Sequence, residues 1–443
     1  MTSQKITRAT GIQTGAPARR INKRNAMALG GGMALEWFDF TVYGLMAALL
    51  APHFFPGSDP VASTLSALMV FAVGFVARPL AGIFIGPIAD RIGHKKILVI
   101  SIAAISGSSL LMGVLPTYDQ IGVWAAAVLV CARLIQGLST GIEQAVGNAA
   151  AVEMATPGQE GRFTTIVSGS ILQAGIMLAS LVSFIVSACV GGDAMAEWGW
   201  RIPFLFGGLA GVFVIYLRRS LPETGAGVRS GDAPPTTAEV WRQVWKSRLG
   251  FLAVLFVVAG TQAANYAWTV GLPGLARAAY NEDPTHIFAV TTMLGILMVV
   301  AGTYVGALCD KYGNLKVFTI VRFTLVPAVF LIVLYNQRGI LTFAAVMLIG
   351  GIAIALNQTL FNFIISTLMP PECRTTGMAV AYGLGVAVFG GTSSYILVWA
   401  QQQDMVWAFS IYAAILSLIS LWLYSLAVRK GQVAIRKVTT NNS

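Results

Sequence analysis

Long apolar runs separated by short polar segments repeat along almost the whole chain. Each run reaches the length of about 20 residues that an α-helix needs to cross the hydrocarbon core of a bilayer. Glycine, proline and charged residues mark the ends of the runs, and together they predict an all-α polytopic membrane protein of twelve transmembrane helices. The predicted spans are 26–50, 62–85, 97–115, 121–148, 163–190, 201–220, 248–272, 286–309, 315–335, 339–363, 375–400 and 405–428.

The longest polar stretch between two spans divides the predicted helices into two sets of six. The expected organisation is an N-terminal tail, a first six-helix half, a linker, a second six-helix half and a C-terminal tail. These parts cover residues 1–25, 26–220, 221–247, 248–430 and 431–443.

The linker contains a short amphipathic pattern. Thr236 and Glu239 have the spacing of a capping box, which satisfies backbone N–H groups at a helix start. In the segment 240–246 that follows, the valines and tryptophans share one helical face and the basic residues lie elsewhere. This pattern predicts a helix lying in the cytoplasmic membrane interface, with a disordered linker as the alternative.

Composition strengthens the membrane assignment. Of the 443 residues, 56% are hydrophobic and only 11% are charged, whereas a soluble domain carries roughly 25% charged residues. The net charge of +11 does not indicate nucleic-acid binding, because the basic residues lie in the short segments between apolar runs. The four cysteines are scattered, so neither a disulfide framework nor a metal site is indicated.

The distribution of basic residues predicts the orientation. Most of the 29 Lys and Arg fall on one side of the membrane if both termini are cytoplasmic, and the outer loops hold only Arg277 and Arg338. By the positive-inside rule this places both termini in the cytoplasm and requires an even number of spans. The first 25 residues are polar and basic, and are expected to be a cytoplasmic tail rather than a signal peptide.

A short internal repeat follows the second span of each half. Gly-Pro-Ile-Ala-Asp-Arg-Ile-Gly at 86–93 recurs as Gly-Ala-Leu-Cys-Asp-Lys-Tyr-Gly at 306–313. Repeated halves are typical of secondary transporters, whose substrate sites lie at the midplane between the repeats. The repeat residues that we take as candidates for gating are Gly86, Asp90, Arg91, Gly93, Asp310 and Lys311.

This repeat resembles the signature loop of the major facilitator superfamily. The resemblance implies two pseudo-symmetric six-helix halves. It also implies that Asp90 meets Arg374, and that Asp310 meets Arg162, each at a helix N-terminus whose dipole favours an anion. Such pairs would close the cytoplasmic side in the outward-facing state and break on opening. A static network that stabilises the fold is the alternative.

Ionisable residues inside the spans point to function, because a charge in the membrane is costly. Asp39 and Tyr43 share a helical face of the first span. Arg322 is expected to extend its head group toward the cytoplasm. The residues at membrane depth are Glu36, Asp39, Arg78, Arg133, Glu143 and Arg322.

Several segments resemble the metabolite:proton symporter family, over about residues 25–430. They are Glu-Trp-Phe-Asp-Phe at 36–40, Arg-Pro at 78–79, Arg-x-x-Gln-Gly at 133–137 and Gly-Trp-Arg-Ile-Pro-Phe at 199–204. The resemblance implies a bacterial inner-membrane protein that takes up small organic acids or zwitterions such as oxoglutarate, citrate, shikimate, proline or betaine. Segment 389–395 resembles the carboxylate branch, and no heptad repeat follows the last span, so a di- or tricarboxylate is the expected substrate.

The first-half charges suggest a coupling mechanism. We expect Asp39 to bind the coupling proton, and its neutralisation to release Arg133, whose planar guanidinium suits bidentate binding of a substrate carboxylate. A permanent ion pair of these two residues is the alternative. Glu36 and Glu143 are further candidates for the proton, and Glu143 alternatively pairs with Arg78.

Other polar residues in the spans are candidate substrate ligands. Transmembrane amides often join helices instead, so this simpler role stays open for each of them. The set consists of Tyr43, Arg78, Arg133, Gln136, Gln262, Asn265, Tyr266, Asn357, Gln358 and Tyr382.

Other classes of protein find little support. The three histidines lie near loops, and neither a nucleotide-binding loop nor a nucleophile with its base is evident, so an enzyme is not expected. A channel needs a filter or ring of charges, and a proton-driven drug exporter, the less favoured transporter, should have a wide apolar pocket. The expected partners are a small organic anion or zwitterion, the proton and the lipid bilayer. We expect a monomer without cofactor, metal or nucleic acid.

Overall fold

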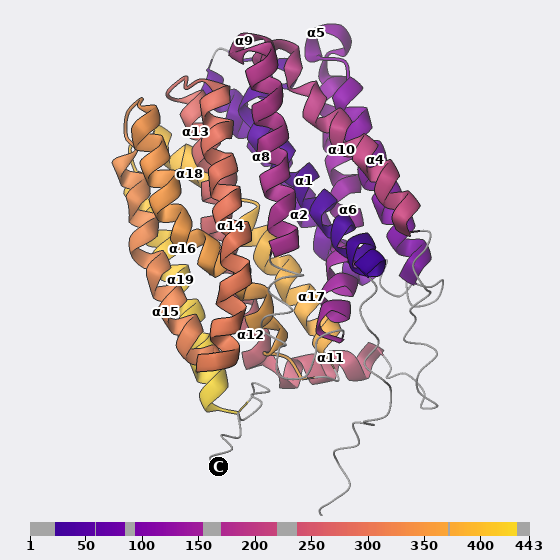
Figure 1. Cartoon of the computed structure of the whole chain (residues 1–443), viewed down its shortest axis with the longest axis vertical. Coiled ribbons are helices and arrows are strands. Elements are labelled where there is room, and N and C mark those ends of the chain that lie inside the picture. Colours follow the sequence, from indigo (N-terminus) through magenta and orange to yellow (C-terminus); the bar gives the residue numbers. More distant parts are fainter. Residues whose placement is uncertain are drawn as a thin grey trace, which may run out of the picture.

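The computed structural model describes residues 23–57, 59–84, 94–153, 170–218, 237–370 and 373–431. Every element among them is helical, and the long helices stand upright in one bundle (Figure 1). Side chains are not described for 23–29, 82–98, 142–153, 217–218, 237–238 and 374–376, nor at positions 240 and 303.

The first half is built from long apolar helices, and short turns join them in pairs at one end of the bundle. Between α4 and α6 lies the single-turn α5 (Tyr118–Ile121), and α9 (Gly192–Ala194) with the π-helix η2 (Met195–Gly199) precedes α10. The long helices are α1 (Lys23–Phe54), α2 (Pro60–Phe84), α4 (His94–Val114), α6 (Val123–Glu153), α8 (Ile171–Val190) and α10 (Arg201–Arg218).

Two spans of the second half contain π-helical turns, which often occur at functional sites. In the seventh span η4 (Ala267–Gly271) joins α12 (Arg248–Tyr266) to α13 (Leu272–Ala278), and in the eleventh η7 (Val386–Gly390) joins α17 (Arg374–Gly385) to α18 (Ser393–Gln402). The sequence pattern did not predict these turns. The other elements are α14 (Pro284–Tyr312), α15 (Asn314–Phe330), η5 (Leu331–Leu334), α16 (Ile340–Ser366) and α19 (Val406–Arg429).

The polytopic membrane architecture is confirmed. Among the described residues, 10 helices are long and apolar enough to cross a membrane, and the pair Gly192–Gly199 and Arg201–Tyr216, bent by 59°, makes 11 if it counts as one span. The predicted third span corresponds to α4, whose apolar part Val99–Val114 is shorter than the others. It packs against α10 and α6 within the same bundle.

The two halves meet along two seams (Figure 1). α8 of the first half packs along α14 of the second, and α2 packs along α17, η7 and α18. Near one end of the bundle, the Ser187 and Thr285 hydroxyls lie 2.8 Å apart across the α8–α14 seam. Near the other end, Gly383 of α17 packs against Pro79 of α2. α1 and α12 lie between the seams, so both contribute side chains to the centre of the molecule.

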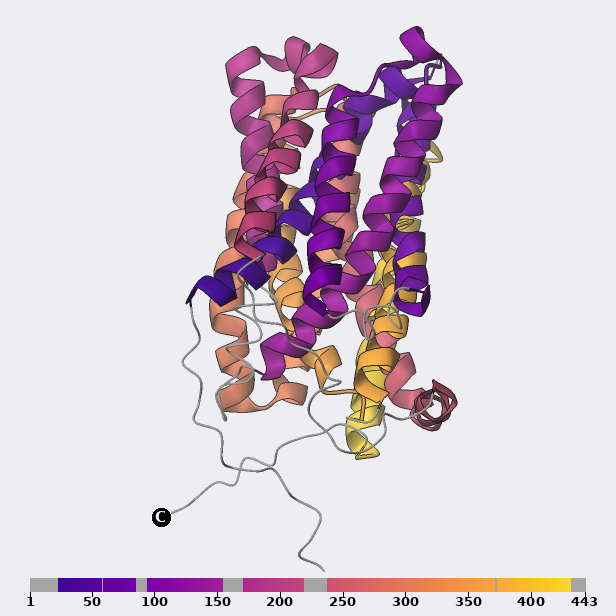
Figure 2. The ribbon, with the colours of Figure 1, turned by 90° about the vertical axis from the view of Figure 1, so that its right-hand side faces the viewer.

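The linker helix α11 (Thr237–Lys246) lies across one end of the bundle, and Figure 2 shows it end-on. Val244 is buried, while Trp241 and Trp245 are exposed. α11 contacts α12 and α17. Thr236 of the expected capping box lies outside the described residues. The position of α11 in the membrane interface stays a prediction.

Candidate functional site

Two arginines of the first half lie together in the middle of the bundle. Arg78 of α2 and Arg133 of α6 are 3% and 0% exposed. Their guanidinium carbons lie 4.1 Å and 4.3 Å from the centre of the Phe40 ring on α1. Since guanidinium groups are attracted to the faces of aromatic rings, Phe40 holds two like charges close to each other.

Most of the hydrogen-bonding capacity of these arginines is unused. None of the three guanidinium nitrogens of Arg78 has a hydrogen-bond partner, and neither Nε nor Nη2 of Arg133 has one. No ion pair joins either residue to a carboxylate in the described part of the chain. Buried cations without counter-ions are costly, and unused guanidinium forks suit a carboxylate or phosphate ligand.

Glycine on α6 allows this placement of Arg133. Gly137 packs directly on the Gly74 backbone of α2, where a side chain would collide. A Cβ added at Gly74 would lie 3.3 Å from Nη2 of Arg133. Small residues let transmembrane helices approach closely. Here the close approach of α6 and α2 brings the Arg133 side chain into contact with α2.

Asp39 of α1 is buried and does not form the expected ion pair with Arg133. Its two carboxyl oxygens have no hydrogen bond of standard geometry, and the groups that face them are the Ser109 hydroxyl of α4 and, at longer range, Arg133. The prediction of a direct pair is wrong, and Arg133 bonds to Gln136 instead. Nη1 of Arg133 donates to Oε1 of Gln136 at 2.7 Å, and Nε2 of Gln136 donates to Oγ of Ser109 at 2.9 Å.

Aromatic side chains from both halves surround the arginines. Tyr266 of α12 stacks on Trp37 at 6.2 Å between ring centres and packs edge-on against Phe71 and Phe75. The Arg133 guanidinium lies 4.4 Å from the centre of the Tyr43 ring. Because the Tyr43 hydroxyl donates to the carbonyl of Ala67, this residue offers the arginine its ring face.

The second half contributes amides with unused hydrogen-bonding atoms. Gln262, Asn265 and Gln358 are buried, and neither amide atom of any of them has a partner. The Tyr266 hydroxyl is also without one. Buried amides usually find partners, so these three suit a polar ligand.

The π-helical turn η7 positions part of this set. Its Gly390 packs against Gln262 and Tyr266, and the Ser393 and Ser394 hydroxyls donate to the carbonyls of Ala263 and Tyr266 at 2.5 Å and 3.0 Å. These contacts fix α18 on α12.

Asn357 has a different role from its neighbours. Its Nδ2 donates to the carbonyls of Val321 and Ala353. It therefore joins α16 to α15, as transmembrane amides often do. Tyr382 of α17 is 8% exposed and stacks on Phe361. Glu36 of α1 is buried.

Arg322 does not extend toward the cytoplasm, and that prediction is wrong. Its side chain is 1% exposed, and its Nη2 donates to the carbonyl of Val257 at 3.2 Å and to the Thr261 hydroxyl at 2.8 Å. The face of α15 that carries Arg322 packs inside the second half. The guanidinium group therefore contacts α12 instead of water.

The gating candidates are only partly described. Gly86, Asp90, Arg91, Gly93 and Arg162 lie outside the described residues, as do the side chains of Glu143 and Arg374. Asp310 and Lys311 end α14, where the Lys311 ammonium lies 5.2 Å from the Tyr312 ring centre. The two expected latch pairs stay predictions.

Ser109 was not singled out from the sequence, although it contacts Gln136 and faces Asp39. The available signal was weak: a hydroxyl within a mostly apolar span, beside two further serines at 106 and 108. Serine in a transmembrane helix usually bonds to its own backbone.

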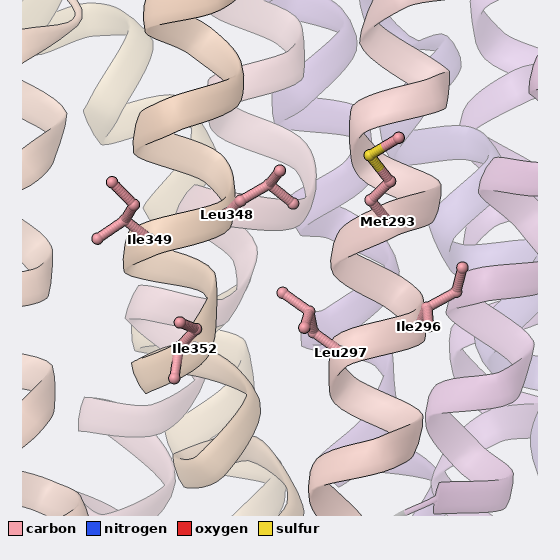
Figure 3. A pocket seen from close by; sticks show the side chains of 6 residues that line it. All are labelled: Met293, Ile296, Leu297, Leu348, Ile349 and Ile352. Carbon is pink, nitrogen blue, oxygen red and sulfur yellow. The ribbon is translucent and has the colours of Figure 1, made fainter.

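A separate groove lies on the outside of the second half (Figure 3). It has a volume of about 420 Å³ and lies between α14 and α16. All its lining side chains are aliphatic or methionine, and four of them are among the exposed large hydrophobics. Such a groove suits a lipid chain and offers nothing to bind an organic anion. Its lining residues are Met293, Ile296, Leu297, Leu348, Ile349 and Ile352.

Both a family model and a solved structure of a transporter match this chain. The family model described as Major Facilitator Superfamily matches residues 29–391. The D-xylose-proton symporter has a similar solved structure, with a TM-score of 0.71 at 14% identity over 90% of this chain and 97% of that one.

Three curated bacterial relatives cover most of the chain. The citrate-proton symporter of Klebsiella pneumoniae is 33% identical over 379 residues, 82% of each protein. The alpha-ketoglutarate permease of Escherichia coli (strain K12) is 29% identical over 406 residues, 90% of this chain and 92% of the relative. The proline/betaine transporter of the same strain is 31% identical over 380 residues, 82% of this chain and 74% of the relative.

Proposed function

Because the chain belongs to the major facilitator superfamily, and within it to the metabolite:proton symporter family, we propose that it couples the uptake of a small organic acid to protons. The substrate is a di- or tricarboxylate such as oxoglutarate, and transport proceeds by alternating access. The protein resides in the bacterial inner membrane with both termini in the cytoplasm. Membership of a transporter family agrees with the expectation that it is not an enzyme.

The observation that carries the substrate class is the pair of buried arginines. Arg78 and Arg133 leave five guanidinium nitrogens without hydrogen-bond partners, and no described carboxylate pairs with either group. An acid with two or more carboxylates would compensate both charges and fill both forks. Across the site, Gln262, Asn265 and Gln358 present amides that hydrogen-bond the remaining oxygens of such a ligand.

The aromatic rings favour an acid over a betaine-like zwitterion. A quaternary ammonium is typically held on the faces of aromatic rings. In this site Arg78 lies over Phe40 and Phe75, and Arg133 over Phe40 and Tyr43. The ring faces that would receive an ammonium group already carry guanidinium groups, which would repel it.

Asp39 is the proton carrier in this proposal. It is buried next to a cationic pair, and its oxygens make no hydrogen bond of standard geometry. A carboxylate in such a place favours the neutral form by desolvation and the charged form by the nearby guanidinium. The balance changes when a substrate carboxylate engages Arg133, so proton and substrate enter together.

The test is uptake into proteoliposomes with an inward proton gradient. We expect labelled oxoglutarate or citrate to accumulate, and an uncoupler to abolish accumulation. Betaine, proline and a cationic dye serve as the other members of the panel. Accumulation of betaine or proline without transport of any carboxylate would overturn the assignment of the substrate class, and efflux of the dye would point to the exporter class.

A further inference from the structure

We propose that Ser109 and Gln136 transmit the protonation state of Asp39 to Arg133, as positioning residues that contact neither proton nor substrate. This inference rests on the proposed function, because it explains how a proton on Asp39 changes the readiness of Arg133 for an anion. It also gives Gln136 a role different from the substrate ligand expected from the sequence.

The chemistry of the groups fixes the direction of the two hydrogen bonds. A guanidinium only donates, so the group of Gln136 that lies 2.7 Å from Nη1 of Arg133 is the amide oxygen. The amide nitrogen then lies 2.9 Å from the Ser109 oxygen and donates to it. With its oxygen accepting from Gln136, the Ser109 hydroxyl keeps its own hydrogen for another acceptor. The acceptor that faces it is Asp39.

The result is a row of polar groups that runs from a cation to an acid. Arg133 donates to Gln136 and Gln136 donates to Ser109, and the Ser109 hydroxyl faces Asp39 without a hydrogen bond of standard geometry. Hydrogen bonds in such a row polarise one another, and the effect is larger in a buried site. Arg133, Gln136 and Ser109 have no measurable exposure, and Asp39 is 1% exposed.

A proton on Asp39 acts at the end of this row. The charged carboxylate attracts the Ser109 hydroxyl hydrogen, which strengthens the bond from Gln136 and holds Nη1 of Arg133 on the amide. A neutral carboxyl removes this pull, and the bond between Arg133 and Gln136 weakens. Nη1 then becomes available to a substrate carboxylate, together with the Nε and Nη2 atoms that have no partner.

Few charged groups lie on the elements that pack around Asp39. Gly207 of α10 packs directly on Oδ1 of Asp39, and it has no side chain that could bind this carboxyl oxygen. From α6 the charged group is Arg133. Glu36 is one turn away on α1 itself, and α2 contributes Arg78. The helices α8 and η4, which also pack on α1, contain no acidic or basic residue.

Further charged groups on elements that pack on α1 include Asp119 of α5 and Glu197 of η2. α13 carries Arg277 near its end, and α10 begins at Arg201. α12 contributes Tyr266, whose ring stacks on Trp37 of α1.

The experiment measures how much a proton improves substrate affinity. Binding of labelled oxoglutarate or citrate to the purified full-length protein is compared in acidic and alkaline buffer, for Ser109→Ala, Gln136→Met and the wild type. By linkage, the ratio of the two affinities equals the factor by which substrate improves proton binding. We expect the ratio to fall by about tenfold in both variants, as expected for the loss of one hydrogen bond to a charged group.

Controls separate coupling from a general effect on the fold. Ser108→Ala removes a buried hydroxyl from the next position of the same helix and should leave the ratio unchanged. A purely structural role for Ser109 would lower both affinities equally. If Ser109→Ala does not reach the membrane, Gln136→Met provides the same test. The double variant should show no further fall, because both residues belong to one row of polar groups.

Failure of the inference differs from failure of the proposed function. An unchanged affinity ratio in both Ser109→Ala and Gln136→Met, with a ratio near one in Asp39→Asn, would overturn the relay and leave Asp39 as the proton carrier. A wild-type ratio in Asp39→Asn would overturn both.

Discussion

At the scale of single residues, the site combines two buried arginines that form no ion pair among the described residues with one acid whose oxygens make no hydrogen bond of standard geometry. Arg78 and Arg133 are held on aromatic rings, which attract their charge without using their hydrogen-bond donors. Aromatic rings therefore keep the guanidinium forks available for a ligand, whereas a protein carboxylate would occupy them. In the proposed function, a substrate carboxylate supplies the negative charge that these guanidinium groups do not find among the described side chains.

Asp39→Asn tests the proton site directly. The amide has nearly the same shape as the acid but cannot exchange a proton in the working range. We expect uphill uptake driven by a proton gradient to be lost, and exchange of internal for external substrate to persist. Both activities are measured in the same proteoliposomes. Accumulation at the wild-type level by this variant would show that the proton binds elsewhere. Glu36 and Glu143 would then be the remaining candidates for the proton site.

At the scale of elements, close helix packing and π-helical turns set the positions of the site residues. Gly137 brings α6 onto α2 and so fixes the location of Arg133. The turns η4 and η7 change the direction of the residues that follow in the seventh and eleventh spans. They lie where the two spans pack against each other and next to Tyr266.

Gly137→Ala should therefore weaken both stability and binding. The added methyl group would collide with the backbone of α2 at Gly74, and overpacking of this kind typically costs about 1–3 kcal/mol. We expect a lower thermal unfolding midpoint and a smaller increase in that midpoint on addition of oxoglutarate or citrate.

Gly107→Ala is the matched control, since nothing lies within 4 Å of a Cβ at that position of α4. Equal midpoints for Gly137→Ala and Gly107→Ala would contradict the importance of the close approach.

At the scale of the whole molecule, the halves contact each other both toward the Ser187 end and toward the Gly383 end of the seams. The arginines and amides of the candidate site are buried. Alternating access requires one set of these contacts to separate while the other holds. α8 and α14, which pack side by side (Figure 1), form one of the surfaces that must separate.

A cross-link across this seam should stop transport. Ser187→Cys with Thr285→Cys, in a protein whose four natural cysteines are replaced by serine, places two thiols where hydroxyls lie 2.8 Å apart. After oxidation we expect loss of uptake, and recovery on reduction. Each single cysteine variant, oxidised in the same way, is the control. Undiminished uptake by the fully cross-linked protein would show that the α8–α14 contact does not open during the cycle.

The spans were predictable from the sequence because lipid imposes a simple rule on each segment separately. A helix satisfies its own backbone, so about 20 apolar residues predict a span whatever lies next to it. The ends of the predicted spans agree with the helices within a few residues for most of the chain. The rarity of charge inside the spans also selected Asp39, Arg78 and Arg133 for attention, because each carries a cost that only function or pairing explains.

The tertiary structure decided which of these residues meet and through what. Arg133 bonds to Gln136 and not to Asp39. Arg322 bonds to α12, although its position in the sequence allowed its head group to reach water. Ser109 entered the site only because α4 packs beside α1 and α6. Apolarity is a property of each segment, and the sequence determines it alone. Contacts depend on helix rotation and depth, which packing between helices sets.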